Sequence, residues 1–75
     1  MEEQRIVHSF RKNESEEIRV SLRSYKDRIY VDLRLFYEAE GEIRPTRKGI
    51  TLGSEFLQEL KRGIEKTERA LAVMA

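Results

Sequence analysis

Cationic and aromatic side chains are interleaved in the middle of this 75-residue chain. The positions concerned are Arg23, Tyr25, Lys26, Arg28, Arg34, Phe36, Tyr37, Arg44, Arg47 and Lys48. Guanidinium and ammonium groups bind phosphates, while aromatic rings stack on bases that a duplex would keep hidden. This mixture favours a surface for single-stranded nucleic acid. The alternative is a solvated hairpin face, which also carries arginine and tyrosine.

The distribution of charge points to the same segment. The net charge is only +1, but residues 18–48 hold eight cations and five acids, a net of +3. Residues 1–17 have a net charge of −2, and residues 49–75 are balanced. The positive charge is therefore concentrated in the middle of the chain, where a solvated face again remains the alternative explanation.

Residues for catalysis or metal binding do not form a recognisable pattern. His8 is the single histidine, and no cysteine, serine or aspartate is spaced around it as in a triad; we interpret it as a partly buried strand residue. The carboxylates lack metal-ligand spacing, and Gly49-x-x-x-Gly53 lacks the Gly-Lys-Ser/Thr of a phosphate loop. The sequence predicts a protein that is not an enzyme, with no catalytic residue, metal or cofactor.

Two runs in this region alternate apolar and polar side chains with a period of two. The runs are 18–25 and 28–37, and each places its aliphatic side chains on one face. The turn between them contains Asp27, which tolerates a left-handed backbone. The two runs therefore predict a β-hairpin.

Two flanking strands complete the predicted sheet. They are 5–12 and 43–52, the second following a turn around Gly41. Pro45 cannot donate a ladder hydrogen bond, so its part of the strand lies at an edge or a bulge, and Gly49 marks a bend. The sheet therefore has four antiparallel strands.

From Ser54 onward the apolar period becomes that of a helix. Ser54 is predicted to cap its amino end, and Glu55 suits the positive pole of the helix dipole. The apolar stripe packs on the sheet of its own chain, on a second subunit, or on both. Its members are Leu57, Leu60, Ile64, Leu71 and Met74, with Thr67 in the gap. The order ββββα predicts an α+β fold.

The length and composition predict one domain over residues 1–75 with a small core. Hydrophobic and charged residues each make up 39%, and without cysteine there are no disulfides, so oligomerisation is the expected source of added stability. No apolar run reaches transmembrane length, and the start "MEEQ" does not resemble a signal peptide. We expect a soluble, cytosol-type protein without a membrane partner.

Residues 18–64 resemble the single-stranded-DNA-binding domain of the transcriptional positive cofactor 4 family. The matching pieces are "VSLR-Y-K", "DLR-FY", "GE--P-RKGI-L" and the following amphipathic helix, in the same order and at nearly the same spacing. The resemblance implies a homodimer of four-stranded curved sheets, each backed by a helix. It also implies binding of unpaired strands in β-channels, with little sequence preference.

The resemblance further implies roles for individual residues. DNA-contacting cations of the family correspond to Arg23, Lys26, Arg28, Arg34, Arg44 and Lys48, with Arg47 between the last two. Tyr25 and Tyr37 stand where the family has stacking rings, and Thr46 replaces a glycine. Glu16 appears near a position that can be a DNA-binding lysine. Arg34 and Tyr37 differ by three positions, so both can face DNA only if an irregularity lies near Phe36.

The expected function is non-sequence-specific binding of single-stranded DNA by a homodimer, which stabilises melted DNA in transcription regulation, replication or repair. Candidate partners are the transcription or replication machinery. The compact chain resembles a prokaryotic or phage member, which would be cytoplasmic and nucleoid-associated; a eukaryotic member would be nuclear. Two alternatives stay open: an RNA-binding module on the same fold, and a protein-interaction domain acting through the C-terminal helix.

Overall fold

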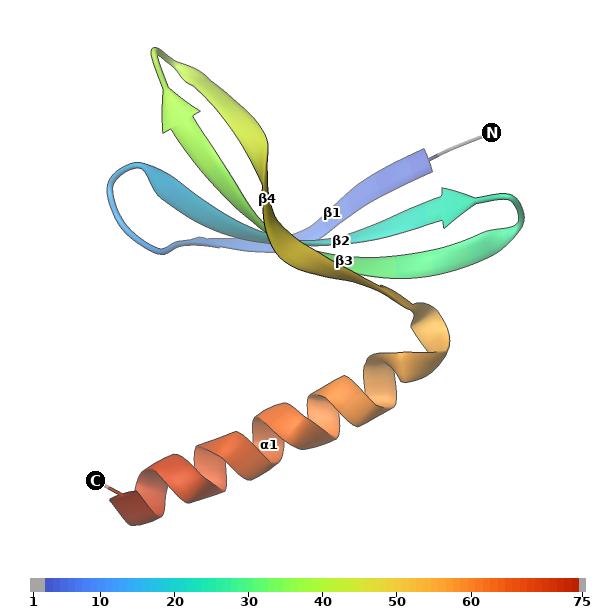
Figure 1. Cartoon of the computed structure of the whole chain (residues 1–75), viewed down its shortest axis with the longest axis vertical. Helices are drawn as coiled ribbons and strands as arrows, with labels where there is room; N and C mark the ends of the chain where they lie inside the picture. The colour runs from blue at the N-terminus through green and yellow to red at the C-terminus, as the bar shows by residue number, and fades with distance from the viewer. Residues whose placement is uncertain (1–2, 75) are drawn as a thin grey trace.

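The computed structural model describes residues 3–74 as an antiparallel sheet followed by one helix (Figure 1). The strands are β1 (Glu3–Arg11), β2 (Glu16–Tyr25), β3 (Arg28–Ala39) and β4 (Glu42–Gly53), and they lie in the sheet in chain order. A 3-10 turn, Ser54–Phe56, connects β4 to α1 (Leu57–Met74). The predicted α+β class and the order ββββα are confirmed.

The two hairpins within β2–β4 are closed by tight turns with a left-handed backbone. Lys26 and Asp27 have φ values of 49° and 65°, and Glu40 and Gly41 have values of 54° and 79°. Two successive residues with positive φ match the right-handed twist of the flanking strands. The prediction that Asp27 and Gly41 mark turns is confirmed.

The register of the strands separates an apolar face from a polar face. Val20 lies opposite Leu33, which lies opposite Ile50, so one face is aliphatic across three strands. On the other face, Arg19 lies opposite Arg34. The ladder between β2 and β3 is uninterrupted, so successive side chains alternate regularly between the two faces.

The outer strands β1 and β4 are both irregular. The register of β1 shifts between Ile6 and His8, and the β3–β4 register shifts between Arg34 and Phe36. Beyond the second shift, the β3–β4 hairpin extends away from the rest of the sheet (Figure 1). The two edges of the sheet are therefore bulged, while its centre is regular.

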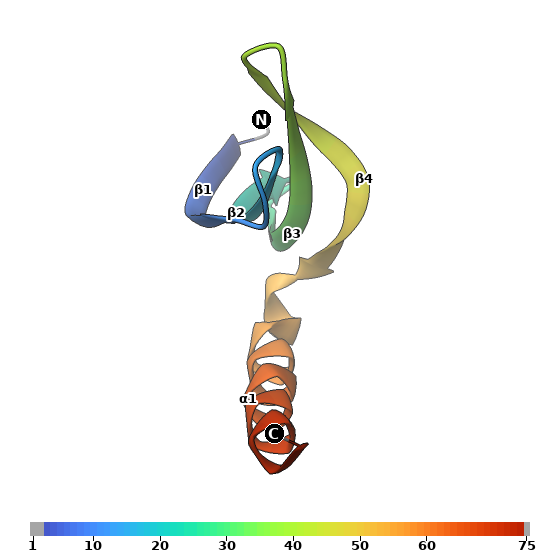
Figure 2. The ribbon, with the colours of Figure 1, turned by 90° about the vertical axis from the view of Figure 1, so that its left-hand side faces the viewer.

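The helix α1 lies below the sheet and does not close over it (Figure 2). Its stripe residues Leu57, Ile64 and Leu71 are 44%, 52% and 64% exposed. An apolar groove, lined by Val20 and Leu33 from the sheet among others, separates the sheet from α1. In the single chain, the stripe is not covered by its own sheet as one alternative predicted.

The amino end of the helix differs from the prediction. Ser54 does not cap α1; it begins the 3-10 turn, and the residue before it, Gly53, has no side chain with which to cap. The extended backbone of Gly53 leads straight into that turn, so α1 begins at Leu57. No helix within residues 3–74 has the length and apolar character needed to cross a membrane.

Candidate nucleic-acid interface

A groove crosses the polar face of the sheet from β1 to β4; we call it the polar groove. It is lined by Gln4 and Ile6 of β1, Arg19 and Arg23 of β2, Asp32, Arg34 and Phe36 of β3, and Pro45 of β4. The strand register places the three arginines on the same face of β2 and β3. The polar groove is therefore lined by guanidinium groups from two adjacent strands.

Beside the polar groove, two aromatic rings line a second hollow, which we call the tyrosine pocket. Its walls are Tyr25 and Tyr30, together with Arg23 and Thr51. Tyr25 is 49% exposed, so its ring is accessible to a ligand. Arg23 lines both hollows, which makes the polar groove and the tyrosine pocket one continuous surface.

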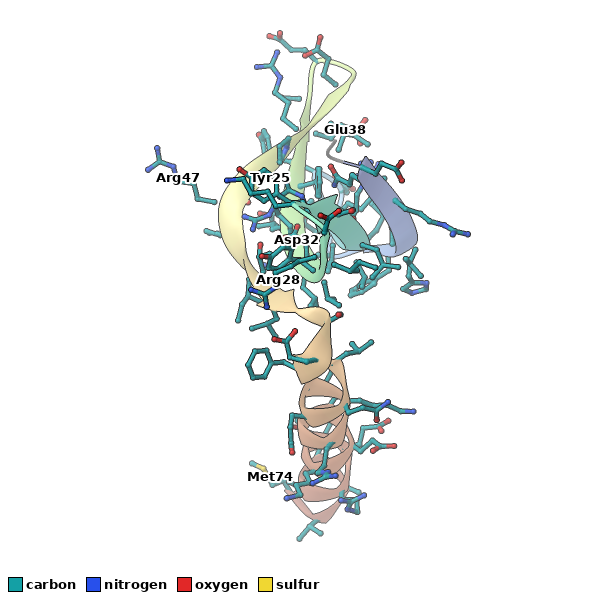
Figure 3. The ribbon with its side chains drawn as sticks, turned by 90° about the vertical axis from the view of Figure 1, so that its right-hand side faces the viewer. Tyr25, Arg28, Asp32, Glu38, Arg47 and Met74 are labelled. Atoms are coloured by element: carbon teal, nitrogen blue, oxygen red, sulfur yellow. The ribbon has the colours of Figure 1, made fainter. Side chains whose placement is uncertain are left out.

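Cations lie against both rings of the tyrosine pocket. The Lys26 ammonium is 5.4 Å from the centre of the Tyr25 ring, and the Arg28 guanidinium is 5.5 Å from that of Tyr30. Arg28 also forms an exposed ion pair with Glu55 at 3.3 Å. Figure 3 views the molecule from the side of the β2–β3 hairpin that carries these residues. Positive charge and stacking surface therefore occur together at this hairpin.

A buried carboxylate lies in the floor of the polar groove. Asp32 is 2% exposed and accepts hydrogen bonds from Arg34 Nε and Nη2 at 3.0 and 2.9 Å and from Thr51 Oγ1 at 2.5 Å. Burial acts to raise the pKa of Asp32, but the hydrogen bonds from Arg34 and Thr51 outweigh it and hold the pKa below its usual value. Asp32 therefore stays ionised and offsets the charge of Arg34.

The Asp32 interaction predicts a component of acid sensitivity. A carboxylate whose pKa is lower in the folded than in the unfolded state stabilises the fold above the unfolded value, about 3.9. That stability should be lost as the pH falls from about 4 through the lower folded pKa, at about 1.4 kcal/mol per pKa unit. Urea denaturation between about pH 2 and 6 should show this loss in wild type and a flatter profile in Asp32→Asn. Asp27→Asn, in the exposed turn, is the matched control; a wild-type slope in Asp32→Asn would contradict the assignment.

Tyr37 and Arg44 form a separate pair in the β3–β4 hairpin. They lie opposite each other in the ladder, and Arg44 forms an ion pair with Glu42 at 2.6 Å. The predicted irregularity near Phe36 is confirmed in position, but its extra residues belong to β4. Because β3 stays regular against β2, Tyr37 and Arg34 fall on opposite faces of β3.

The last two predicted cations lie on the bulged part of β4. Arg47 projects away from the strand (Figure 3). Lys48 lines a hollow beside the bulge with Lys12, Ile18 and Leu35 among others. Within one chain, the nine predicted residues thus fall into three groups: Arg23, Tyr25, Lys26, Arg28 and Arg34 at the polar groove and tyrosine pocket; Tyr37 and Arg44 in the hairpin; and Arg47 and Lys48 on the bulge.

Sequence reasoning missed two residues of this surface. Tyr30 forms a wall of the tyrosine pocket, and Arg19 lines the polar groove with its guanidinium 4.4 Å from the centre of the Phe36 ring. Both alternate onto the same face as Arg23, which is a signal that could have identified them. The interface is therefore more aromatic than the predicted list implied.

His8 does not occupy the environment that we expected. It is exposed in the single chain and lies 6.0 Å from the Phe10 ring, tilted by 42°, rather than partly buried. Over the described residues 3–74, β1 is an edge strand of the sheet and pairs with β2 alone. Within residues 3–74, no group of three or more His, Cys, Asp or Glu residues could hold a metal ion.

The chain is similar to a known protein family and to a named member of the same type. Residues 12–63 match the model of a family described as Transcriptional Coactivator p15 (PC4). The chain is 37% identical over 60 residues to the RNA polymerase II transcriptional coactivator KIWI of Arabidopsis thaliana. This match spans 80% of the chain but 56% of the relative.

Solved structures show the same architecture. A PC4 homologue from Burkholderia pseudomallei superposes with a TM-score of 0.81 at 33% identity, over 87% of this chain and 89% of that one. A bacteriophage T5 homologue of PC4, implicated in recombination-dependent DNA replication, matches 99% of this chain and 97% of its own length with a TM-score of 0.50. At 18% identity, that second match shows the fold alone.

Proposed function

Because the chain belongs to the PC4 family of transcriptional coactivators, we propose that it binds single-stranded DNA as a homodimer and stabilises melted DNA. The observation that carries the proposal is the continuity of the polar groove with the tyrosine pocket. This surface combines guanidinium groups with accessible rings. The site residues proposed for direct contact are Arg23, Tyr25, Lys26 and Arg28, and we add Tyr30 because its ring lines the same pocket.

The proposed binding mode separates two kinds of contact. Arginine and lysine side chains neutralise phosphates, which fixes the strand in the polar groove without reading its sequence. Tyrosine rings stack on bases, and every base offers a face for this. A duplex already stacks and pairs its bases, so it would gain from the charge but not from the rings.

The uncovered apolar surfaces support the homodimer. The stripe on α1 and the aliphatic face of the sheet line opposite sides of the apolar groove, and neither fills it. Small domains with little core gain stability by pairing, and soluble pairs of identical chains are usually two-fold symmetric. A second copy of α1 is the proposed occupant of this space, which would complete both cores at once.

The proposed partners follow from family membership alone. The relative from Arabidopsis is named as a transcriptional coactivator of RNA polymerase II, and the phage homologue is described as implicated in recombination-dependent DNA replication. By this relationship, we propose the transcription or replication machinery as partners of the DNA-bound form. Tyr37, Arg44, Arg47 and Lys48 are proposed to extend the contact surface beyond the tyrosine pocket.

Binding should be selective for unpaired strands and should weaken with salt. Each cation that neutralises a phosphate should add about −0.7 to the slope of log affinity against log salt, so Arg23, Lys26 and Arg28 alone should contribute about −2. Titration of labelled oligo-dT, oligo-rU and duplex DNA of equal length at several salt concentrations measures this. Arg28→Ala should flatten the slope by about 0.7, whereas Lys66→Ala on α1 should leave it unchanged.

The same titration separates the alternative functions. Equal or tighter binding of oligo-rU would favour the RNA-binding module. Affinity that does not change with salt would contradict the phosphate contacts. A protein that binds none of the three ligands would refute the proposal and leave the stripe on α1 as a protein-interaction surface.

A further inference from the structure

The bulge in β4 places two adjacent cations opposite a single residue of β3. Arg34 pairs with Gly49 and Phe36 pairs with Pro45, so the three residues 46–48 all lie opposite Leu35. Residues 47 and 48 of this bulge are Arg and Lys. Within residues 3–74, neither forms an ion pair, unlike the acid-paired Arg34 and Arg44.

Hydrogen bonds at Thr46 hold the bulge in place. The Thr46 hydroxyl donates to the Leu35 carbonyl at 2.7 Å and accepts from the Lys48 backbone N–H at 3.1 Å. The Thr46 carbonyl accepts from Arg34 Nη1 at 3.0 Å. The first residue of the bulge is thus fixed to β3 through both its side chain and its backbone.

Arg34 has little capacity left for a phosphate. It makes four hydrogen bonds, to the Asp32 carboxylate twice, to the Thr46 carbonyl and to Thr51 Oγ1. A guanidinium has about five N–H donors, so about one remains, whereas arginine binds phosphate best through two parallel bonds. The Asp32 carboxylate also offsets its charge at 2.9 Å.

The backbone opposite Arg34 is closely packed against it. A Cβ atom added at Gly49 would lie 2.5 Å from the Leu33 carbonyl oxygen, 2.9 Å from Arg34 Cα and 3.1 Å from Arg34 Cζ. Two of these three neighbours are backbone atoms, which cannot yield as a flexible side chain could. The glycine therefore lets the Arg34 side chain lie across β4 and reach Thr46.

We propose that Arg34 is a positioning residue, which holds the bulge so that Arg47 and Lys48 meet the phosphates of a nucleic-acid strand. Asp32 orients its guanidinium, Gly49 makes room for it, and Thr46 receives it. The inference rests on the proposed function for the identity of the ligand. It reassigns Arg34 from a phosphate contact to a support for two other cations.

A double-mutant cycle distinguishes positioning from direct contact. The paired variant Asp32→Asn/Arg34→Gln removes the charge pair without leaving a buried carboxylate alone. It should weaken oligo-dT binding about fivefold in the wild-type background, as expected for loss of about one net hydrogen bond. It should have no further effect in an Arg47→Ala/Lys48→Ala background. Equal losses in both backgrounds would show that Arg34 contacts DNA directly and would overturn the proposal.

Thr46→Val is the second variant, because it removes a hydroxyl of the bulge but no charge. It should also weaken oligo-dT binding, and again only where Arg47 and Lys48 are present. The melting temperatures of Asp32→Asn/Arg34→Gln and Thr46→Val check that both variants are folded. If both are folded and bind oligo-dT as tightly as the wild type, the proposal is overturned.

A measurement without DNA separates this proposal from the proposed function. Amide hydrogen exchange at Lys48, whose N–H is bonded to Thr46 Oγ1, should accelerate in Asp32→Asn/Arg34→Gln, and Thr46→Val, which removes the acceptor, gives the reference for complete loss of this bond. If exchange accelerates but the wild type does not bind oligo-dT, Arg34 does hold the bulge. The same result would refute single-stranded DNA as the ligand. Unchanged exchange would show that Arg34 does not hold the bulge.

Discussion

Leu60→Asp should convert the protein from a two-chain assembly into a monomer. Leu60 lines the apolar groove between the sheet and α1, where the second copy is proposed to pack. An aspartate there would be buried without a partner, at a cost of about 3–5 kcal/mol, which raises the dissociation constant at least about a hundredfold. Light scattering at micromolar concentration should give twice the chain mass of 8.9 kDa for the wild type and a single chain mass for the variant.

The matched control is Val73→Asp, which makes the same kind of change on a different side of α1. Val73 is 86% exposed, and its position is outside the apolar stripe. This variant should remain a dimer. A wild type that stays monomeric would exclude the paired arrangement, and a dimer that tolerates Leu60→Asp would place the interface elsewhere.

Tyr25→Ala should weaken binding of single-stranded DNA by about 1–3 kcal/mol, or about 5- to 150-fold, because a stacking ring is lost. The exposed ring forms a wall of the tyrosine pocket beside the Lys26 ammonium. Tyr25→Phe and Tyr25→Trp should cost much less, since both keep a ring. The salt dependence should stay nearly the same, because no cation is removed. Fluorescence titration and thermal melting of each variant measure affinity and stability separately.

Tyr37→Ala is the comparison that the structure offers for this experiment. Tyr37 is 48% exposed, close to the 49% of Tyr25, but it lies in the β3–β4 hairpin beside Arg44. If the hairpin extends the interface as proposed, this variant should also bind more weakly. Normal affinity in a folded Tyr37→Ala dimer would remove Tyr37 from the site, and normal affinity in Tyr25→Ala would refute stacking at the tyrosine pocket.

The fold could be predicted because its signals are local. Alternation along 18–25 and 28–37 identifies strands, and Asp27 and Gly41 mark the turns that join β2, β3 and β4. The position of α1 could not be predicted in the same way. The apolar stripe indicates that one face of α1 is buried. The pattern does not indicate whether the residues that bury it belong to the same chain or to a second one.

The sequence gives the number of cations directly, but it was harder to predict which of them are not already paired with an acid and can bind a phosphate. Three arginines each have an acid two positions earlier on the same strand: Glu17–Arg19, Asp32–Arg34 and Glu42–Arg44. Residues two apart on a strand share a face, so these pairs were visible in the sequence as Glu-x-Arg or Asp-x-Arg. Counting arginines without this spacing overstates the positive potential of the surface.

The bulge in β4 depends on contacts between distant residues, which no local pattern contains. The hydroxyl of Thr46 bonds to Leu35 and Lys48 and fixes three residues opposite one. An irregularity near Phe36 was predicted because the resemblance places both Arg34 and Tyr37 on DNA, and the structure has an irregularity at that position. The sequence could not assign the extra residues to β4, because the register is set by the pairing of both strands.

The bulged outer strands have a consequence for solubility. An edge strand with free backbone groups can pair with the edge of another molecule, and repeated pairing of this kind leads to fibrous aggregates. β1 exposes Ile6, Val7 and Phe10, which would favour such growth, but the shift at Val7 interrupts its row of backbone donors and acceptors. On β4, Pro45 removes a donor just before the bulge. Neither outer strand offers an unbroken row of backbone groups to another molecule. The protein can therefore expose apolar side chains for binding and still resist repeated edge-to-edge association.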